Sequence, residues 1–176
     1  MTRTIFVSPC LLGFRVRWDA RASASDASAF SRFVAAGGRI VSLCPECAGG
    51  LPTPRPPCEI RGERGGDGVL LGLAKVVSKT GEDRTLQYLD GARSALSLCL
   101  ENGVKVAVLK NGSPACGCSR IYDGTFSGEK IAGSGVMASL LAQSGIRVFS
   151  EERLIEALAA ALEPEDKSSG CYCCAS

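Results

Sequence analysis

Short apolar runs alternate along the chain with apolar positions at helical spacing. Residues 4–9, 39–43, 104–110 and 146–149 are compact apolar segments, which predict buried strands. Between them and after the last one, a spacing of three or four residues predicts amphipathic helices. The apolar positions of these helices, in chain order, are Phe30, Phe33 and Val34; Leu86, Leu89, Ala92, Leu96, Cys99 and Leu100; Val136, Met137, Leu140 and Leu141; and Leu154, Ile155, Leu158 and Leu162.

Helix ends are marked by capping residues. Asp26 precedes the first helix and Ser150 the last one, and both residue types accept hydrogen bonds from the free N–H groups of a helix start. Glu151 and Glu152 then favour the same helix through its dipole. Pro164 is predicted to end it, because proline has no N–H to continue the helical ladder.

This order predicts an α/β fold, with a small, mostly parallel, Rossmann-like sheet and helices on both faces. Segments 59–61 and 73–78 flank Gly-Gly-Asp-Gly and predict a hairpin excursion from that sheet. Residues 49–57 hold four of the chain's eight prolines and predict a stiff, extended loop. We expect residues 1–164 to form a single domain, and the polar segment 165–176, with Cys171, Cys173 and Cys174, to be a disordered tail.

Composition removes several classes of function. The net charge is +2 in 176 residues, so polymeric nucleic acid is not the expected partner. The absence of histidine excludes Ser-His-Asp and Cys-His nucleophile pairs, together with imidazole metal ligands. The apolar run 5–7 is too short for a signal peptide and no segment is long enough to cross a membrane, which predicts a cytoplasmic protein with reduced thiols.

The cysteines carry the candidate chemistry. Ligands of parallel sheets bind beyond the carboxyl ends of the strands. Cys10 follows the first predicted strand, Cys44 follows the second, and Cys116 lies in the loop after the third. If these strands are neighbours, the three thiols converge on one crevice. Cys99 falls on the apolar stripe of a helix and is predicted to be a core residue.

Two metal sites are compatible with this spacing. Cys44-x-x-Cys47 with Cys116-x-Cys118 predicts a four-thiolate zinc site. Cys10, Cys44 and Cys116 alone instead predict an iron–sulfur cluster with one iron left open for chemistry. A thioredoxin-like function is disfavoured, because prolines and glycines follow Cys47 where a helix is needed.

A glycine-rich segment, Gly133-Ser-Gly-Val-Met-Ala138, resembles a dinucleotide-binding turn. Such a site needs a buried strand directly before it, and residues 127–132 are too polar to form one. We therefore expect a helix start whose free N–H groups favour an anion rather than a nicotinamide cofactor.

Polar residues near the candidate ligands have ordinary alternatives. Glu46 lies two residues from Cys44 and is either a site carboxylate or a solvated one, and Ser113 is either functional or a turn residue. Arg55 and Lys110 either supply positive charge to a thiolate site or face water.

Three motifs together resemble the thiouracil desulfidase family. They are Cys10-Leu-Leu-Gly13; Cys44-Pro-Glu46 followed by the proline-rich segment 49–57; and Lys110-Asn-Gly-Ser-Pro-Ala-Cys-Gly117 with Ile121-Tyr-Asp-Gly-Thr-Phe126. Their order matches, and the resemblance extends from about Phe6 to Glu151. It implies a 4Fe-4S cluster held by Cys10, Cys44 and Cys116, with catalytic roles for Glu46 and Ser113. Ala115 departs from the family pattern, where a serine is expected, and Cys47 and Cys118 are additional thiols.

The implied activity is a non-redox desulfuration of a small-molecule thiopyrimidine (base, nucleoside or nucleotide), giving uracil and hydrogen sulfide. The open iron would bind the thiocarbonyl sulfur, which is a soft donor. Glu46 would act as general acid and base, and Ser113 would orient the substrate or relay a proton. The alternative is a structural zinc or iron–sulfur binding module without catalysis. The sequence leaves open the choice between 2-thio and 4-thio substrates and the oligomeric state.

Overall fold

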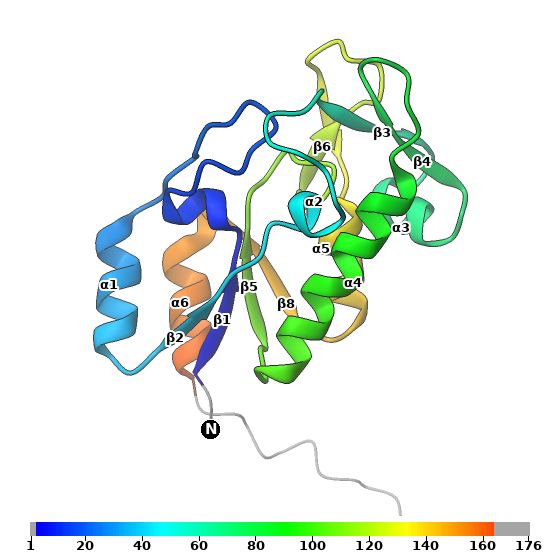
Figure 1. The fold of residues 1–176 in the computed structure, drawn as a ribbon. Helices are drawn as coiled ribbons and strands as arrows, with labels where there is room; N and C mark the ends of the chain where they lie inside the picture. The colour runs from blue at the N-terminus through cyan, green and yellow to red at the C-terminus, as the bar shows by residue number, and fades with distance from the viewer. Residues whose placement is uncertain (1–2, 164–176) are drawn as a thin grey trace, which may run out of the picture.

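Four parallel strands form the central sheet, in the order β2-β1-β5-β8 (Figure 1). The computed structural model describes residues 3–163, so Pro164 and the predicted tail lie outside it. The strands are short, as the apolar runs predicted: β1 (Thr4–Val7), β2 (Arg39–Val41), β5 (Val106–Leu109) and β8 (Arg147–Ser150). The predicted parallel α/β sheet is confirmed.

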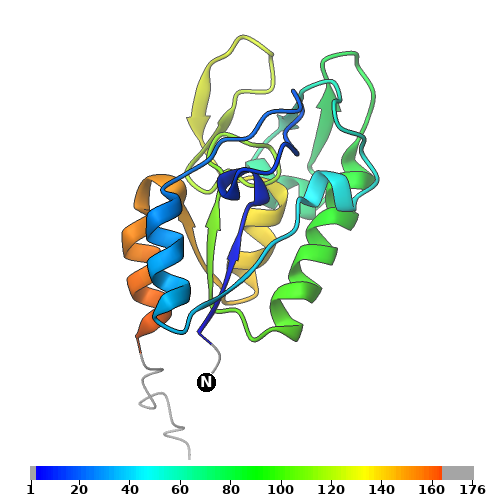
Figure 2. The ribbon, with the colours of Figure 1, turned by 60° about the vertical axis from the view of Figure 1, so that its left-hand side comes forward.

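Helices cover both faces of the sheet (Figures 1 and 2). α1 (Ala27–Ala35) and α6 (Leu154–Leu162) lie on one face, and α4 (Thr85–Glu101) and α5 (Val136–Gln143) on the other. Successive side chains of a strand point to opposite faces. Ile5 and Val7 therefore pack in the core under α1 and α6, while Phe6 packs in the core with α4 and α5.

The buried helix faces differ in part from the predicted ones. Val34, Leu86, Leu100 and Ile155, each predicted to be a core position, are exposed. On α4 the buried face is instead a stripe of mostly small residues, namely Tyr88, Gly91, Ala92, Ala95 and Cys99. The small residues let α4 approach α2 (Pro45–Ala48) so closely that a Cβ on Gly91 would lie 1.7 Å from the Pro45 carbonyl oxygen. Leu86 and Leu100 are left exposed by this packing, whereas Leu89 and Leu96 are half-buried against the core as predicted. Cys99 is fully buried, as predicted.

Of the two predicted caps, one is confirmed. The Asp26 carboxylate accepts hydrogen bonds from the N–H groups of Ser28 and Ala29 at the start of α1. Ser150 makes no capping hydrogen bond, so the second prediction was wrong. A 3₁₀ turn, η2 (Glu151–Arg153), separates Ser150 from α6, and the first carboxylate of that turn binds a neighbouring loop rather than the helix start.

Two hairpins lie beyond the carboxyl edge of the sheet (Figure 1). The predicted one consists of antiparallel β3 (Cys58–Gly62) and β4 (Ala74–Ser78), joined through a short helix, α3 (Gly65–Leu70), rather than a tight turn. The second, β6 (Arg120–Tyr122) with β7 (Lys130–Ala132), was not predicted. β7 is exposed along its length, so its polar sequence carried no apolar strand signal.

Two further turns follow the strands directly. A 3₁₀ turn, η1 (Pro9–Leu12), follows β1, and α2 follows β2. The helical turn of α2 begins at Pro45, where proline fits because the first N–H of a helix has no internal partner. We expected no helix after Cys44, and that expectation was wrong. Within residues 3–163, no helix is both long and apolar enough to cross a membrane.

Candidate active site

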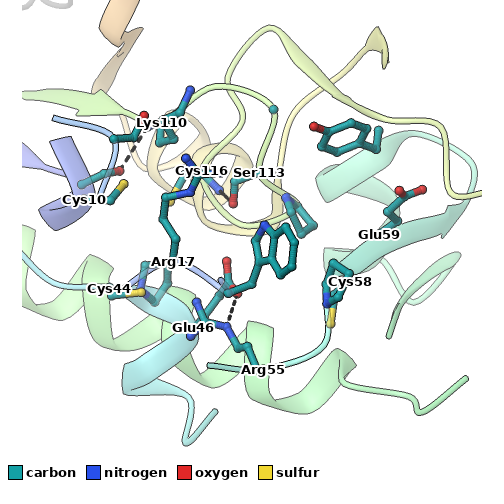
Figure 3. Close-up of a pocket in the computed structure, with 18 of the residues that line it drawn as sticks. Cys10, Arg17, Cys44, Glu46, Arg55, Cys58, Glu59, Lys110, Ser113 and Cys116 are labelled. Carbon is teal, nitrogen blue, oxygen red and sulfur yellow. Dashed lines mark hydrogen bonds and ion pairs between the residues drawn. The ribbon is translucent and has the colours of Figure 1, made fainter. Parts of the chain in front are cut away.

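A cavity of about 400 Å³ lies beyond the carboxyl edge of the sheet. The chain leaves β1 for β2 on one side and later returns to β5 on the other, which makes this edge the switch point where α/β sheets bind ligands. The cavity collects all five residues singled out from the sequence, although they span more than a hundred positions (Figure 3): Cys10, Cys44, Glu46, Ser113 and Cys116.

Three of the lining residues are cysteines at the ends of neighbouring strands. Cys10 belongs to η1, Cys44 is the cap of α2, and Cys116 lies in the loop after β5. Burial raises the pKa of Cys10 to about 11 and the pKa of Cys44 to about 12. Burial also raises the pKa of Cys116 well above its ordinary value. These thiols are therefore neutral at pH 7.

The other described cysteines are Cys47, Cys58, Cys99 and Cys118. Cys58 lines the cavity at the start of β3, whereas Cys47 and Cys118 do not line it. The four-thiolate grouping of the two Cys motifs therefore does not surround the cavity. Across the described residues, no three Cys, Asp or Glu side chains are grouped closely enough to hold a single metal ion. The tail cysteines lie outside the described residues.

Glu46 is paired with a buried arginine. Its Oε2 accepts a hydrogen bond of 2.7 Å from Arg55 Nε, and the Arg55 side chain is only 3% exposed (Figure 3). Burial works to lower the pKa of Arg55, but the Glu46 carboxylate and the nearby Cys44 and Cys47 hold it above its ordinary value. The guanidinium is therefore a fixed positive charge beside the candidate carboxylate.

The same guanidinium joins three segments of the chain. Arg55 Nη1 donates to the Pro52 carbonyl and to Thr53 Oγ1, both at 3.0 Å, and Nη2 donates to the Val16 carbonyl at 2.9 Å. The backbone N–H of Arg55 donates to the Trp18 carbonyl at 2.9 Å. Arg55 thus connects α2, the proline-rich loop and the loop after η1.

Ser113 organises the loop that carries Cys116. Its Oγ accepts hydrogen bonds from the N–H groups of Ala115 and Cys116, each at 3.1 Å. Asn111 fixes the base of the same loop, because its Oδ1 accepts from the backbone N–H groups of Ser119 and Arg120. Ser113 is therefore a turn residue that also lines the cavity.

Lys110 also lies at the cavity rather than facing bulk water. Its ammonium forms an ion pair with Glu151, whose second oxygen accepts the Asn111 N–H at 2.8 Å. This pair ties the end of β5 to the end of β8.

Several lining residues had no signal in the sequence. Tyr88 lines the cavity from the buried stripe of α4. In the sequence, a tyrosine at such a position cannot be distinguished from an ordinary core residue. Burial, with Glu46 and Cys58 beside the phenol, raises its pKa well above the ordinary value. Glu59 reaches it from β3 and Trp18 from the loop after η1. Only the fold brings these elements together.

The predicted anion site at Gly133–Ala138 was wrong. Gly135 does begin α5, but the N–H groups of Val136 and Met137 donate to the carbonyls of Pro114 and Ala115. The loop after β5 therefore occupies the helix start. β7 before it is exposed, as expected from its polarity, so the buried strand of a dinucleotide site does not precede it.

The fold and the cavity define a class: an α/β protein with three cysteines at the carboxyl ends of neighbouring parallel strands. The model of the 2-thiouracil desulfurase family matches residues 5–153, and the chain belongs to this family. It is 46% identical over 154 residues to Uncharacterized protein YbbK of Bacillus subtilis (strain 168), covering 88% of this chain and 99% of that one. Among solved structures, it is similar to the 4Fe-4S-dependent thiouracil desulfidase TudS, with a TM-score of 0.79 and 44% identity over 89% of this chain and 96% of that one.

Proposed function

We propose that the protein is a 4Fe-4S-dependent desulfidase that converts a thiouracil-type pyrimidine to uracil and hydrogen sulfide. The observation that carries this proposal is the meeting of Cys10, Cys44 and Cys116 with Glu46 and Ser113 in one cavity. Membership of the family and the similarity to a 4Fe-4S-dependent relative support it.

The chemistry of the cavity fits the proposed cluster. Thiolates are the protein ligands of 4Fe-4S clusters, and Cys10, Cys44 and Cys116 are all free and buried or half-buried. A cluster binds each cysteine through a different iron atom, so its ligands need not converge on one point as zinc ligands must. Three ligands leave one iron without a protein thiolate, and the bound cluster then supplies a soft Lewis acid for a thiocarbonyl sulfur.

Glu46 is the proposed acid–base residue. The overall reaction exchanges C=S and H₂O for C=O and H₂S, so a proton must leave the attacking water and reach the departing sulfur. A carboxylate at the cavity wall can accept the first proton and return one to sulfur. Arg55 holds the Glu46 carboxylate in one orientation through a 2.7 Å hydrogen bond, so the carboxylate has a fixed position at the cavity wall.

Ser113 is the proposed substrate-positioning group. Its oxygen already accepts two backbone N–H groups, so its O–H hydrogen is free to be donated to a pyrimidine oxygen or nitrogen. Because Ser113 lines the cavity, a substrate bound there can reach this hydrogen.

The test is an anaerobic preparation assayed for iron, acid-labile sulfide and sulfide release from 2-thiouracil, 4-thiouracil and their nucleosides and nucleotides. We expect about four irons and four sulfides per chain, with turnover of at least one thiopyrimidine. Glu46→Gln should keep the cluster and lose about 10²–10⁴-fold in kcat. Glu101→Gln, an exposed control on α4, should behave like the wild type. A full cluster without turnover of any of these compounds would instead identify a structural iron–sulfur module, and undiminished turnover by Glu46→Gln would remove the role of that carboxylate.

A further inference from the structure

Four aromatic side chains line the cavity, and the proposed mechanism uses none of them. Tyr88 is buried, while Arg61 lies over the ring of Phe126 and Lys130 over the ring of Tyr122. Trp18, the chain's single tryptophan, lies in the loop between η1 and α1, lines the cavity and remains 44% exposed. Burying an indole in the core is favourable, and a half-exposed indole forgoes part of that gain. Because Trp18 lines the cavity, a ligand bound there can cover part of this exposed area.

The backbone of this loop is fixed although the indole is not covered. The Trp18 carbonyl accepts the Arg55 N–H at 2.9 Å, and the Val16 carbonyl accepts Arg55 Nη2 at 2.9 Å. Within the loop, the Ala20 N–H donates to the Arg17 carbonyl at 2.9 Å. Because the Arg55 side chain binds both Glu46 and the Val16 carbonyl, it holds the backbone of the Trp18 loop and the candidate carboxylate relative to one another.

We propose that Trp18 is the stacking surface for the pyrimidine ring of the substrate. This inference rests on the proposed function and adds the residue that binds the ring face, as distinct from the groups that act on its sulfur. A pyrimidine is flat, and its two faces gain most from contact with an aromatic plane. Glu46, Ser113 and the thiols offer polar or sulfur contacts to the ring edge, so the face needs a different partner.

The test measures binding apart from turnover, on the cluster-loaded protein. Uracil and 5,6-dihydrouracil present the same hydrogen-bonding edge, but only uracil has a planar π-face. In calorimetric titrations the wild type should bind uracil about 10-fold more tightly than dihydrouracil. Trp18→Leu, which keeps apolar bulk without an aromatic face, should bring the two affinities together, and Trp18→Phe should keep most of the difference.

Kinetics on the same variants provide the second readout. Trp18→Leu should raise KM for thiouracil about 10-fold with a smaller change in kcat, since it removes binding of the ring and leaves the acid–base group in place. The matched control is Phe14→Ala, which removes an exposed aromatic of the same loop that does not line the cavity, and it should match the wild type in both assays. Iron content checks that each variant is folded and loaded.

Equal affinity of the wild type for uracil and dihydrouracil, including no binding of either, would overturn the inference. A Trp18→Leu protein with full iron content that still prefers uracil by the wild-type factor would overturn it too. Failure of the proposed function has a different signature, because it appears as the absence of sulfide release from the wild type whatever the titrations show.

Discussion

The two sides of the cavity are built in different ways. On the thiol side, Cys10 and Cys44 directly follow β1 and β2, so the hydrogen-bond ladder of the sheet determines where they lie. We define the outer side as Trp18, Arg55 and Glu59 with the loops they contact. Glu59 belongs to β3, but the loops are irregular, and the buried charged side chains of Arg55 and Glu59 hold them in place. We therefore expect substitutions on the thiol side to remove the cluster. Substitutions on the outer side should instead weaken substrate binding and lower the free energy of unfolding.

The largest effects are expected on the thiol side. Replacing Cys10, Cys44 or Cys116 by alanine should remove most of the iron and abolish turnover, because each would remove one of the three proposed ligands. The measurement is iron and acid-labile sulfide per chain beside sulfide release on the same sample. These variants should remain folded, since the sheet does not depend on the thiols.

Neighbouring cysteines are the matched controls for this prediction. Cys47→Ala and Cys118→Ala change thiols of the same two motifs that do not line the cavity, and both should keep most of the iron. Loss of the cluster in either control would show that the ligand set is wrong.

A smaller but still large effect is expected at Arg55. Arg55→Met breaks a buried ion pair and leaves the Glu46 charge without its partner, which typically costs about 3–5 kcal/mol. Urea unfolding should show this loss, and turnover should fall with it because the carboxylate and the Trp18 loop lose their common anchor. Arg55→Lys should rescue little, since a lysine cannot reproduce the planar fork that reaches Glu46, Thr53 and Val16 together.

A double variant separates the contribution of the ion pair from that of the other hydrogen bonds of Arg55. Adding Glu46→Gln to Arg55→Met removes the unpaired charge and should recover part of the lost stability, but not turnover. If the double variant were as unstable as Arg55→Met alone, the lost bonds to the loops would account for the cost and the ion pair would not.

The smallest effect is expected at Glu59. Its Oε2 accepts the N–H groups of Gly124 at 2.9 Å and Phe126 at 3.0 Å, and so holds the loop of the β6–β7 hairpin against β3. Glu59→Ala leaves these donors without their partner and should cost about 1–3 kcal/mol and raise KM, because Phe126 lines the cavity. Glu59→Gln retains an oxygen that can accept both bonds, so it should stay near the wild type in urea unfolding and KM. A Glu59→Gln protein as impaired as Glu59→Ala would mean that the negative charge, rather than the hydrogen bonds, is required.

The parts of the fold predicted from sequence are those with a strong periodic signal. The short apolar strands and the Asp26 cap were predicted correctly, because a buried strand needs an unbroken apolar run and a cap needs an oxygen beside free N–H groups. α4 shows where the signal fails. Its leucines suggested one face, but close packing on α2 selects the small residues around Gly91, and spacing alone does not report how near another backbone lies.

The sequence by itself determined the chemistry available to this protein: thiols, carboxylates and hydroxyls without histidine, with Cys10 and Cys44 placed after strands and Cys116 in the next loop. It also determined the family, through three motifs in order. Only the tertiary structure decided that Arg55 joins Glu46 to the Trp18 loop, that Pro114 and Ala115 occupy the start of α5, and which thiols share a cavity. The physical reason is that a residue type limits what a side chain can do, whereas its partners, burial and neighbouring charges come from segments far away in the chain.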